Sequence, residues 1–171
     1  MEEITRKLYT QQANTYEKRW SKYLQATHQQ ALQATKLPRK AHVLDLSAGT
    51  GLFSKQLRKH YPEVRIDLLD ASKDMLRIAR KRFNKDQQTT ICEADATNIP
   101  ASNDTYDAIY LLSALQHYKQ PQQVLKEARR TLKEEGKLIL VAWTKTTWWS
   151  KLVYALLQLH PTHHTIPQPS N

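Results

Sequence analysis

Between residues 42 and 143, short apolar runs alternate with segments in which apolar side chains recur at helical spacing. The runs that read as buried strands cover residues 42–46, 64–69, 89–93, 106–112 and 136–143. The helical patterns cover residues 50–60, 72–83 and 122–133. Strands that alternate with helices of this length form a parallel sheet with helices on both faces. Because crossovers between parallel strands are right-handed, the alternation predicts an α/β fold with a doubly wound sheet.

The segments on either side of this alternation differ from it. Apolar side chains at spacings of three and four predict helix over residues 2–35, and Pro38 ends this region. At the other end, an apolar stretch from Trp148 to Leu159 predicts a further helix. We therefore divide the chain into an N-terminal helical part (1–38), a core (39–145) and a C-terminal helix with a frayed tail (146–171).

The composition limits the compartment and the partners. A single cysteine, Cys92, excludes an internal disulfide framework, and we expect it to pack within its strand. No signal-peptide pattern follows Met1 and no apolar run approaches the ~20 residues of a membrane span, so we expect a cytoplasmic protein. We expect no metal site. The net charge is +10, and residues 55–85 hold ten Lys and Arg against four Asp and Glu. This surplus favours acidic partners, but we prefer a solvated helix face to a nucleic-acid site.

Two of the three glycines, Gly49 and Gly51, lie in one loop between the first strand and the helix after it. In a chain this poor in glycine, the pair indicates a local requirement of the backbone. Small residues let a ligand approach the backbone, and the helix that follows presents free N–H groups and partial positive charge. In an open parallel sheet the ligand lies where the strand order reverses, which here is the end of the first strand.

An aspartate lies at or just after the end of each of the first three strands. Asp70 follows the glycine loop by about 20 residues, where a carboxylate can accept hydrogen bonds from both hydroxyls of a ribose. Asp95, after the third strand, can accept a hydrogen bond from an adenine amine. A dinucleotide site explains Asp70 but gives no role to Asp45 and Asp95. A ligand with a ribose, an adenine and an amino-acid end uses all three.

Five segments, in the correct order, resemble the motifs of class I methyltransferases that depend on S-adenosylmethionine (SAM). They are residues 43–51, 69–76, 93–100, 106–117 and 132–138. The resemblance is strongest to the branch that includes the ubiquinone/menaquinone-biosynthesis C-methyltransferases and many small-molecule methyltransferases. It implies SAM as cofactor, a Rossmann-like, mostly parallel sheet of strand order 3-2-1-4-5, and a helical lid in residues 1–38.

The resemblance also implies how single residues hold SAM. Asp45 would engage the ammonium group, Asp70 the ribose, and Asp95 with Ala96 the edge of the adenine. The other residues that it places around SAM are Ser47, Ala48, Gly49, Gly51, Ala71, Met75 and Leu111. The resemblance also implies that the methyl acceptor is contacted by Tyr9 and Tyr16 of the lid and by His117. His117 is also a candidate general base, although we favour a structural role because alignment alone supports many methyl transfers.

Two features depart from the family pattern. Ser47 stands where the first glycine is usual, and we expect this position not to need a positive φ. In addition, only about 28 residues follow Trp143, so the usual C-terminal antiparallel hairpin is expected to be missing. The fifth strand would then be an edge that the tail, a second copy or another partner covers. We favour this covering role for the helix from Trp148 to Leu159, with a substrate lid or a membrane-interface element as alternatives.

The sequence thus predicts a SAM-dependent methyltransferase that acts on a small molecule. Two alternatives stay open. The first is a degenerate or truncated module that binds SAM or a partner without turnover. The second is an RNA-directed methyltransferase, which is weakened because the fourth strand ends in Tyr110-Leu111-Leu112-Ser113. It therefore lacks the Asp/Asn-Pro-Pro-Tyr/Phe signature often used to methylate bases.

Overall fold

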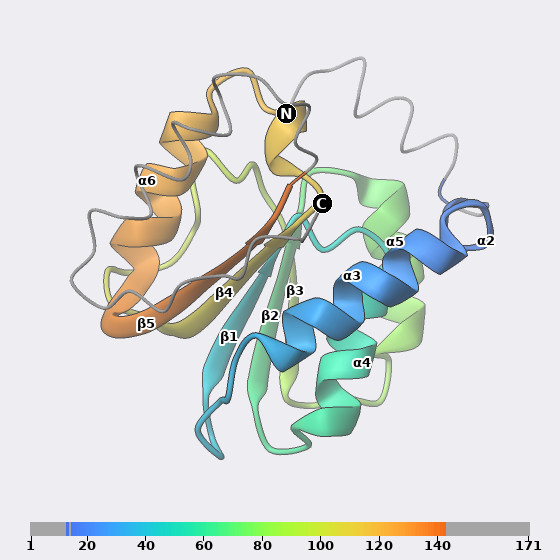
Figure 1. Cartoon of the computed structure of the whole chain (residues 1–171), viewed down its shortest axis with the longest axis horizontal. Coiled ribbons are helices and arrows are strands. Elements are labelled where there is room, and N and C mark those ends of the chain that lie inside the picture. Colours follow the sequence, from blue (N-terminus) through green and yellow to red (C-terminus); the bar gives the residue numbers. More distant parts are fainter. Residues whose placement is uncertain (1–12, 14, 143–171) are drawn as a thin grey trace, which may run out of the picture.

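A five-stranded parallel sheet forms the centre of the molecule, in the order β3-β2-β1-β4-β5 (Figure 1). The computed structural model describes Ala13 and residues 15–142. The strands are β1 (His42–Leu46), β2 (Arg65–Asp70), β3 (Thr89–Glu93), β4 (Tyr106–Leu112) and β5 (Leu132–Val141). The helices are α2 (Tyr16–Arg19), α3 (Ser21–Gln33), α4 (Leu52–His60), α5 (Lys73–Arg82) and α6 (Pro121–Thr131), with a short 3-10 turn, η1 (Leu115–His117). The predicted α/β fold and strand order are confirmed.

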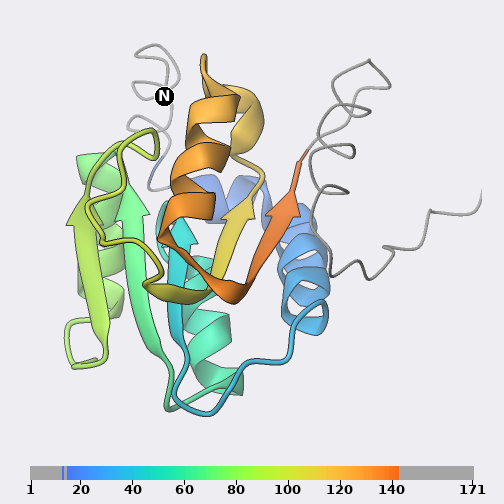
Figure 2. The ribbon, with the colours of Figure 1, turned by 90° about the vertical axis from the view of Figure 1, so that its left-hand side faces the viewer.

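Helices cover both faces of the sheet, but unequally. In Figure 2, α6 lies in front of the sheet while α3, α4 and α5 lie behind it. Alternate residues of β1 show the same division, because successive side chains of a strand point to opposite faces. Val43 packs in one core cluster with residues of α3, α4 and α5, whereas Leu44 and Leu46 pack in the other cluster with residues of α6. Asp45 therefore shares the face of Val43.

Several boundaries differ from those predicted. The fifth strand begins at Leu132, before the predicted Gly136, because its register with β4 shifts: Tyr106 pairs with Leu132, and Ala108 already pairs with Lys137. The extra residues form a bulge at the start of the strand. The N-terminal helical pattern is divided at Trp20, whose φ of −107° departs from helical geometry. Cys92 lies half-buried in β3 as a free thiol.

Some predictions fall outside the described residues. These are the placement of Tyr9, the helix from Trp148 to Leu159 and the expected absence of a C-terminal hairpin. Within residues 15–142, no helix is long and apolar enough to cross a membrane.

Candidate functional site

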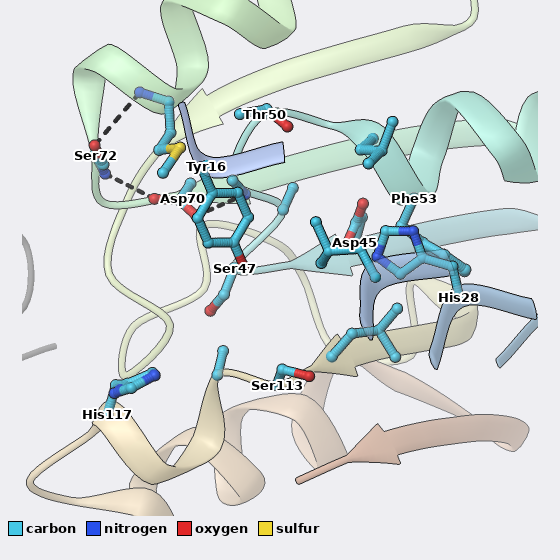
Figure 3. Close-up of a pocket in the computed structure, with 17 residues that line it drawn as sticks. Tyr16, His28, Asp45, Ser47, Thr50, Phe53, Asp70, Ser72, Ser113 and His117 are labelled. Atoms are coloured by element: carbon cyan, nitrogen blue, oxygen red, sulfur yellow. Dashed lines mark hydrogen bonds between the residues drawn. The ribbon is translucent and has the colours of Figure 1, made fainter. Parts of the chain in front are cut away.

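A pocket lies at the carboxyl ends of β1, β2 and β4, where the strand order reverses (Figure 3). Its walls come from the segments that follow these strands and from α2, α3 and α4. The predicted residues that line it are Tyr16, Asp45, Ser47, Ala48, Gly49, Asp70, Met75 and His117. Residues that are far apart in the sequence thus meet at the place where the doubly wound topology requires a ligand.

The glycine loop follows β1 and leads into α4. Gly49 and Gly51 both have positive φ, 56° and 72°. A Cβ on Gly51 would lie 2.8 Å from Leu68 and 2.9 Å from Phe83, whereas a Cβ on Gly49 would meet nothing within 4 Å. Gly51 therefore allows the loop to pack closely on the core, and Gly49 supplies backbone freedom beside the pocket.

Ser47 corrects our expectation for the first position of this loop. Its φ is 65°, in the left-handed region that favours glycine. A residue with a Cβ costs about 1–2 kcal/mol in this region. The Ser47 hydroxyl lies 2.7 Å from the hydroxyl of Tyr118, and this hydrogen bond helps to hold the strained residue in place. The loop thus keeps the glycine-like backbone although the glycine is absent.

Asp45 is the buried carboxyl group at the end of β1, with 3% of its surface exposed. The Ser54 hydroxyl of α4 donates a hydrogen bond of 2.6 Å to its Oδ2. Burial raises the pKa of Asp45 to about 7; the Ser54 hydrogen bond opposes this shift and the nearby Asp70 adds to it. The charged form of Asp45 is therefore poorly compensated by the protein alone, and a bound cation would stabilise it.

Asp70 ends the neighbouring strand and is 5% exposed. Its Oδ2 accepts a hydrogen bond from the Gly49 amide and its Oδ1 from the Ser72 amide, each at 2.8 Å. Burial raises the pKa of Asp70, and these hydrogen bonds oppose that effect. Ser72 is the N-cap of α5, because its hydroxyl accepts a hydrogen bond from the Met75 amide. Asp70 thus ties the glycine loop to the start of α5, and its remaining lone pairs can still accept hydrogen bonds from a diol.

The segment after β4 forms the other side of the pocket. Ser113 has a φ of 57°, and its hydroxyl lies 2.6 Å from the hydroxyl of Tyr23 of α3. His117 lines the same side, and burial lowers its pKa. Strained backbone at two pocket serines, Ser47 and Ser113, is typical of functional sites, where the surrounding structure holds the strain.

Not every predicted residue lines the pocket. Those outside its lining are Gly51, Ala71, Asp95, Ala96 and Leu111. Leu111 and Ala96 are fully buried in the core, and Leu112 and Ser113 form the wall where Leu111 was expected. Asp95 Oδ1 accepts hydrogen bonds from the amide and hydroxyl of Thr97, at 2.9 and 2.8 Å.

The structure also adds lining residues that the sequence reasoning missed, among them Leu24, His28 and Phe53. Leu24 and His28 lie one helical turn apart on α3. Their spacing indicates a shared buried face. Only the packing of α3 against α4, β4 and β5 shows that this face reaches the pocket.

The residues present fit SAM. Asp70 can hold a ribose diol, and the glycine loop leaves open space at Gly49 for close approach of a ligand. The poorly compensated carboxyl of Asp45 suits an ammonium group, and Met75 adds an apolar wall.

Comparisons with known proteins show the family to which the chain belongs. A family model described as "Methyltransferase domain" matches residues 43–136. Demethylmenaquinone methyltransferase from Thermotoga maritima is 37% identical over 99 residues, which are 58% of this chain and 42% of that protein. A ubiquinone/menaquinone biosynthesis C-methyltransferase from Cupriavidus necator is 32% identical over 112 residues, 64% of this chain and 45% of that protein. The matches thus span less than half the length of either relative.

A solved structure gives the same picture of the fold. A SAM-dependent methyltransferase from Aquifex aeolicus superposes with a TM-score of 0.57 at 22% identity, over 63% of this chain and 58% of that one.

Proposed function

The chain belongs to the methyltransferase-domain family, whose members use SAM, and on this premise we propose that it binds SAM in the pocket and transfers the methyl group to a small molecule. One observation carries the proposal. Two buried carboxyl groups, Asp45 and Asp70, stand at the ends of adjacent parallel strands in the same pocket as the glycine loop. A dinucleotide would use only the second of them.

In this proposal, different residues of the chain bind different parts of SAM. Asp70 holds the ribose, Asp45 holds the ammonium group, and the backbone from Ser47 to Gly51 surrounds the amino-acid part. Ala71 and Met75 border the adenine, while Asp95 and Ala96 read its edge from beside the pocket. When bound, SAM supplies a methyl group on a positively charged sulfur. The chain contributes mainly alignment of the acceptor with that carbon, together with exclusion of water.

We propose an apolar aromatic acceptor of the quinol type. Both relatives above carry quinone-biosynthesis names, and the pocket has aromatic and apolar walls in Tyr16, Phe53 and Leu112. His117 lies on the acceptor side of the pocket. Because burial lowers its pKa, its ring is neutral at neutral pH and can accept a proton from the acceptor.

The remaining proposals concern the segments on either side of the core, the edge of β5 and the compartment. We propose that residues 1–38, with Tyr9 and Tyr16, act as a lid over the pocket and that residues 39–145 make up the SAM-binding core. The tail, or a second copy of the chain, covers the edge of β5. Within residues 15–142, β5 pairs with β4 alone, so its other edge offers unpaired backbone groups to such a partner. The working compartment is the cytoplasm.

Calorimetric titration with SAM and with its product S-adenosylhomocysteine tests the binding claim. We expect heat from both ligands, and the absence of binding to either would exclude the function. Transfer of a labelled methyl group from SAM to a panel of hydroquinones and anionic acceptors then tests the activity. Binding without transfer to any acceptor would favour the alternative of a SAM-binding module without turnover.

A further inference from the structure

α3 contributes an imidazole to the pocket that no role assigned above uses. His28 lines the pocket and is 5% exposed. Its ring meets Phe53 edge to face, with centroids 5.4 Å apart, and Phe53 in turn packs on Tyr110 at 4.7 Å. Figure 3 shows His28 and Asp45 at the same end of the pocket. The aromatic contacts therefore hold a polar ring from α3 in the wall of the pocket that Asp45 also lines.

The His28 ring has unused hydrogen-bonding capacity. Its Nδ1 is buried, and among residues 15–142 it has no hydrogen-bond partner. Burial lowers the pKa of His28 to about 4, and a side-chain hydrogen bond with Gln56 and the charge of Glu17 oppose this shift more weakly. The ring is therefore neutral at neutral pH and has one donor and one acceptor nitrogen. A neutral ring does not repel a cation. A buried nitrogen that lacks a hydrogen bond is stabilised when a ligand supplies one.

Two acceptors thus lie at one end of the pocket, the Asp45 carboxyl and the neutral imidazole. An ammonium group has three donors, no acceptor and a positive charge, so it suits this pair better than a hydroxyl or a carboxylate does. We propose that His28 and Asp45 together bind the ammonium group at the amino-acid end of the methyl donor, so that α3 forms part of the cofactor site. This inference rests on the proposed function and extends it to a residue outside the family motifs.

Two ligands that differ only at the amino-acid end test the proposal by calorimetry. S-adenosylhomocysteine has the ammonium group, and 5′-methylthioadenosine keeps the adenosine and the thioether without it. His28→Phe keeps the aromatic packing on Phe53 but removes the acceptor. We expect this variant to bind S-adenosylhomocysteine about tenfold more weakly, with an unchanged affinity for methylthioadenosine. His28→Gln restores a side-chain acceptor and should recover most of the affinity.

The outcomes separate this proposal from the proposed function. An equal loss for both ligands, or no loss for either, would overturn the role of His28 while the SAM site stands. If the unaltered protein binds neither ligand, the proposed function fails and the inference fails with it. Nitrogen NMR of the imidazole in the unaltered protein gives a readout that needs no variant. The His28 resonances should shift on addition of S-adenosylhomocysteine and not of methylthioadenosine, and a lack of any such difference counts against the proposal.

Discussion

The two halves of the pocket are built in different ways. The half proposed to hold the methyl donor, called the donor half, consists of the ends of β1 and β2 with their loops, residues 45–51 and 70–75. The half proposed to hold the methyl acceptor, called the acceptor half, consists of residues 112–117 with Tyr16. In the donor half, backbone amides of Gly49 and Ser72 bind one carboxylate within 21 residues of sequence. In the acceptor half, Ser113 is held by a side chain 90 residues away, Tyr23. A loop whose backbone amides bind a carboxylate at a fixed spacing can be predicted from the sequence, whereas hydroxyl contacts over long sequence distances, such as Ser113 with Tyr23 and Ser47 with Tyr118, cannot.

The largest expected effect is on the pH dependence of stability, when the buried carboxyl group of the donor half, Asp45, is replaced. Burial raises the folded-state pKa of Asp45 from its ordinary value of 3.8 to about 7. Because the folded state holds this proton more tightly than the unfolded state, the contribution of Asp45 to stability is full below pH 4 and is lost as the pH rises to about 7. Asp45→Asn should remove this loss, and its stability relative to the unaltered protein should rise by about 3–4 kcal/mol between those limits.

Urea unfolding at several pH values measures the difference between the two proteins. Asp70, whose charge affects Asp45, is present in both proteins, so the difference between their stability curves measures the titration of Asp45 together with its coupling to Asp70. Parallel stability curves over this range would show that Asp45 titrates normally and that the donor half lacks a poorly compensated charge.

The glycine pair supplies a matched test of close packing in the same half. Gly51→Ala meets Leu68 and Phe83 and retains a positive φ, so we expect a loss of about 2–3 kcal/mol in the free energy of unfolding. Gly49→Ala has only the backbone cost, about 1 kcal/mol, because its Cβ meets nothing within 4 Å. Equal losses in chemical denaturation would mean that packing behind the loop does not distinguish the two positions.

Asp70→Ala tests the ligand-binding role of the donor half. It removes the proposed ribose contact and frees the amides of Gly49 and Ser72, so SAM affinity should fall by about 2 kcal/mol, or roughly thirtyfold. Thermal unfolding without ligand provides the control for the loss of the two amide contacts. An unchanged SAM dissociation constant would show that the ribose is held elsewhere.

The smallest expected change in stability comes from replacing the two strained serines, one in each half. Ser47→Gly and Ser113→Gly both relieve a positive φ, and each also loses one hydroxyl–hydroxyl contact, to Tyr118 and to Tyr23. Relief of strain and loss of the hydrogen bond are each about 1 kcal/mol, so the net change in stability should be within about 1 kcal/mol of zero. Tyr118→Phe and Tyr23→Phe lose the contact without relieving the positive φ and should each destabilise the fold. A net loss well above this limit in either glycine variant would show that the hydroxyl contact outweighs the strain.

Much of the donor half could be predicted because the features that indicate it can be recognised in short stretches of the sequence. A strand that ends in Asp45, a glycine loop and a carboxylate about 20 residues later are all visible without knowing the fold. We expected Leu111 in the pocket wall, but the next residue, Leu112, lines it instead. A strand turns successive side chains to opposite faces, and only the register of β4 with β1 and β5 shows that Leu112 and Ser113 reach the pocket.

The resemblance to a family implied the order of the sheet, whereas the sequence by itself determined the alternation of strands and helices and the position of the ligand loop. These follow from periodicity and from residues with special backbone or charge requirements. Only the tertiary structure decided that Ser47 takes a glycine-like φ and that His28 of α3 lies in the pocket with Asp45. The reason is physical: the conformation of Ser47 and the burial of His28 depend on packing with segments such as Tyr118 and Phe53, and no local pattern encodes those contacts.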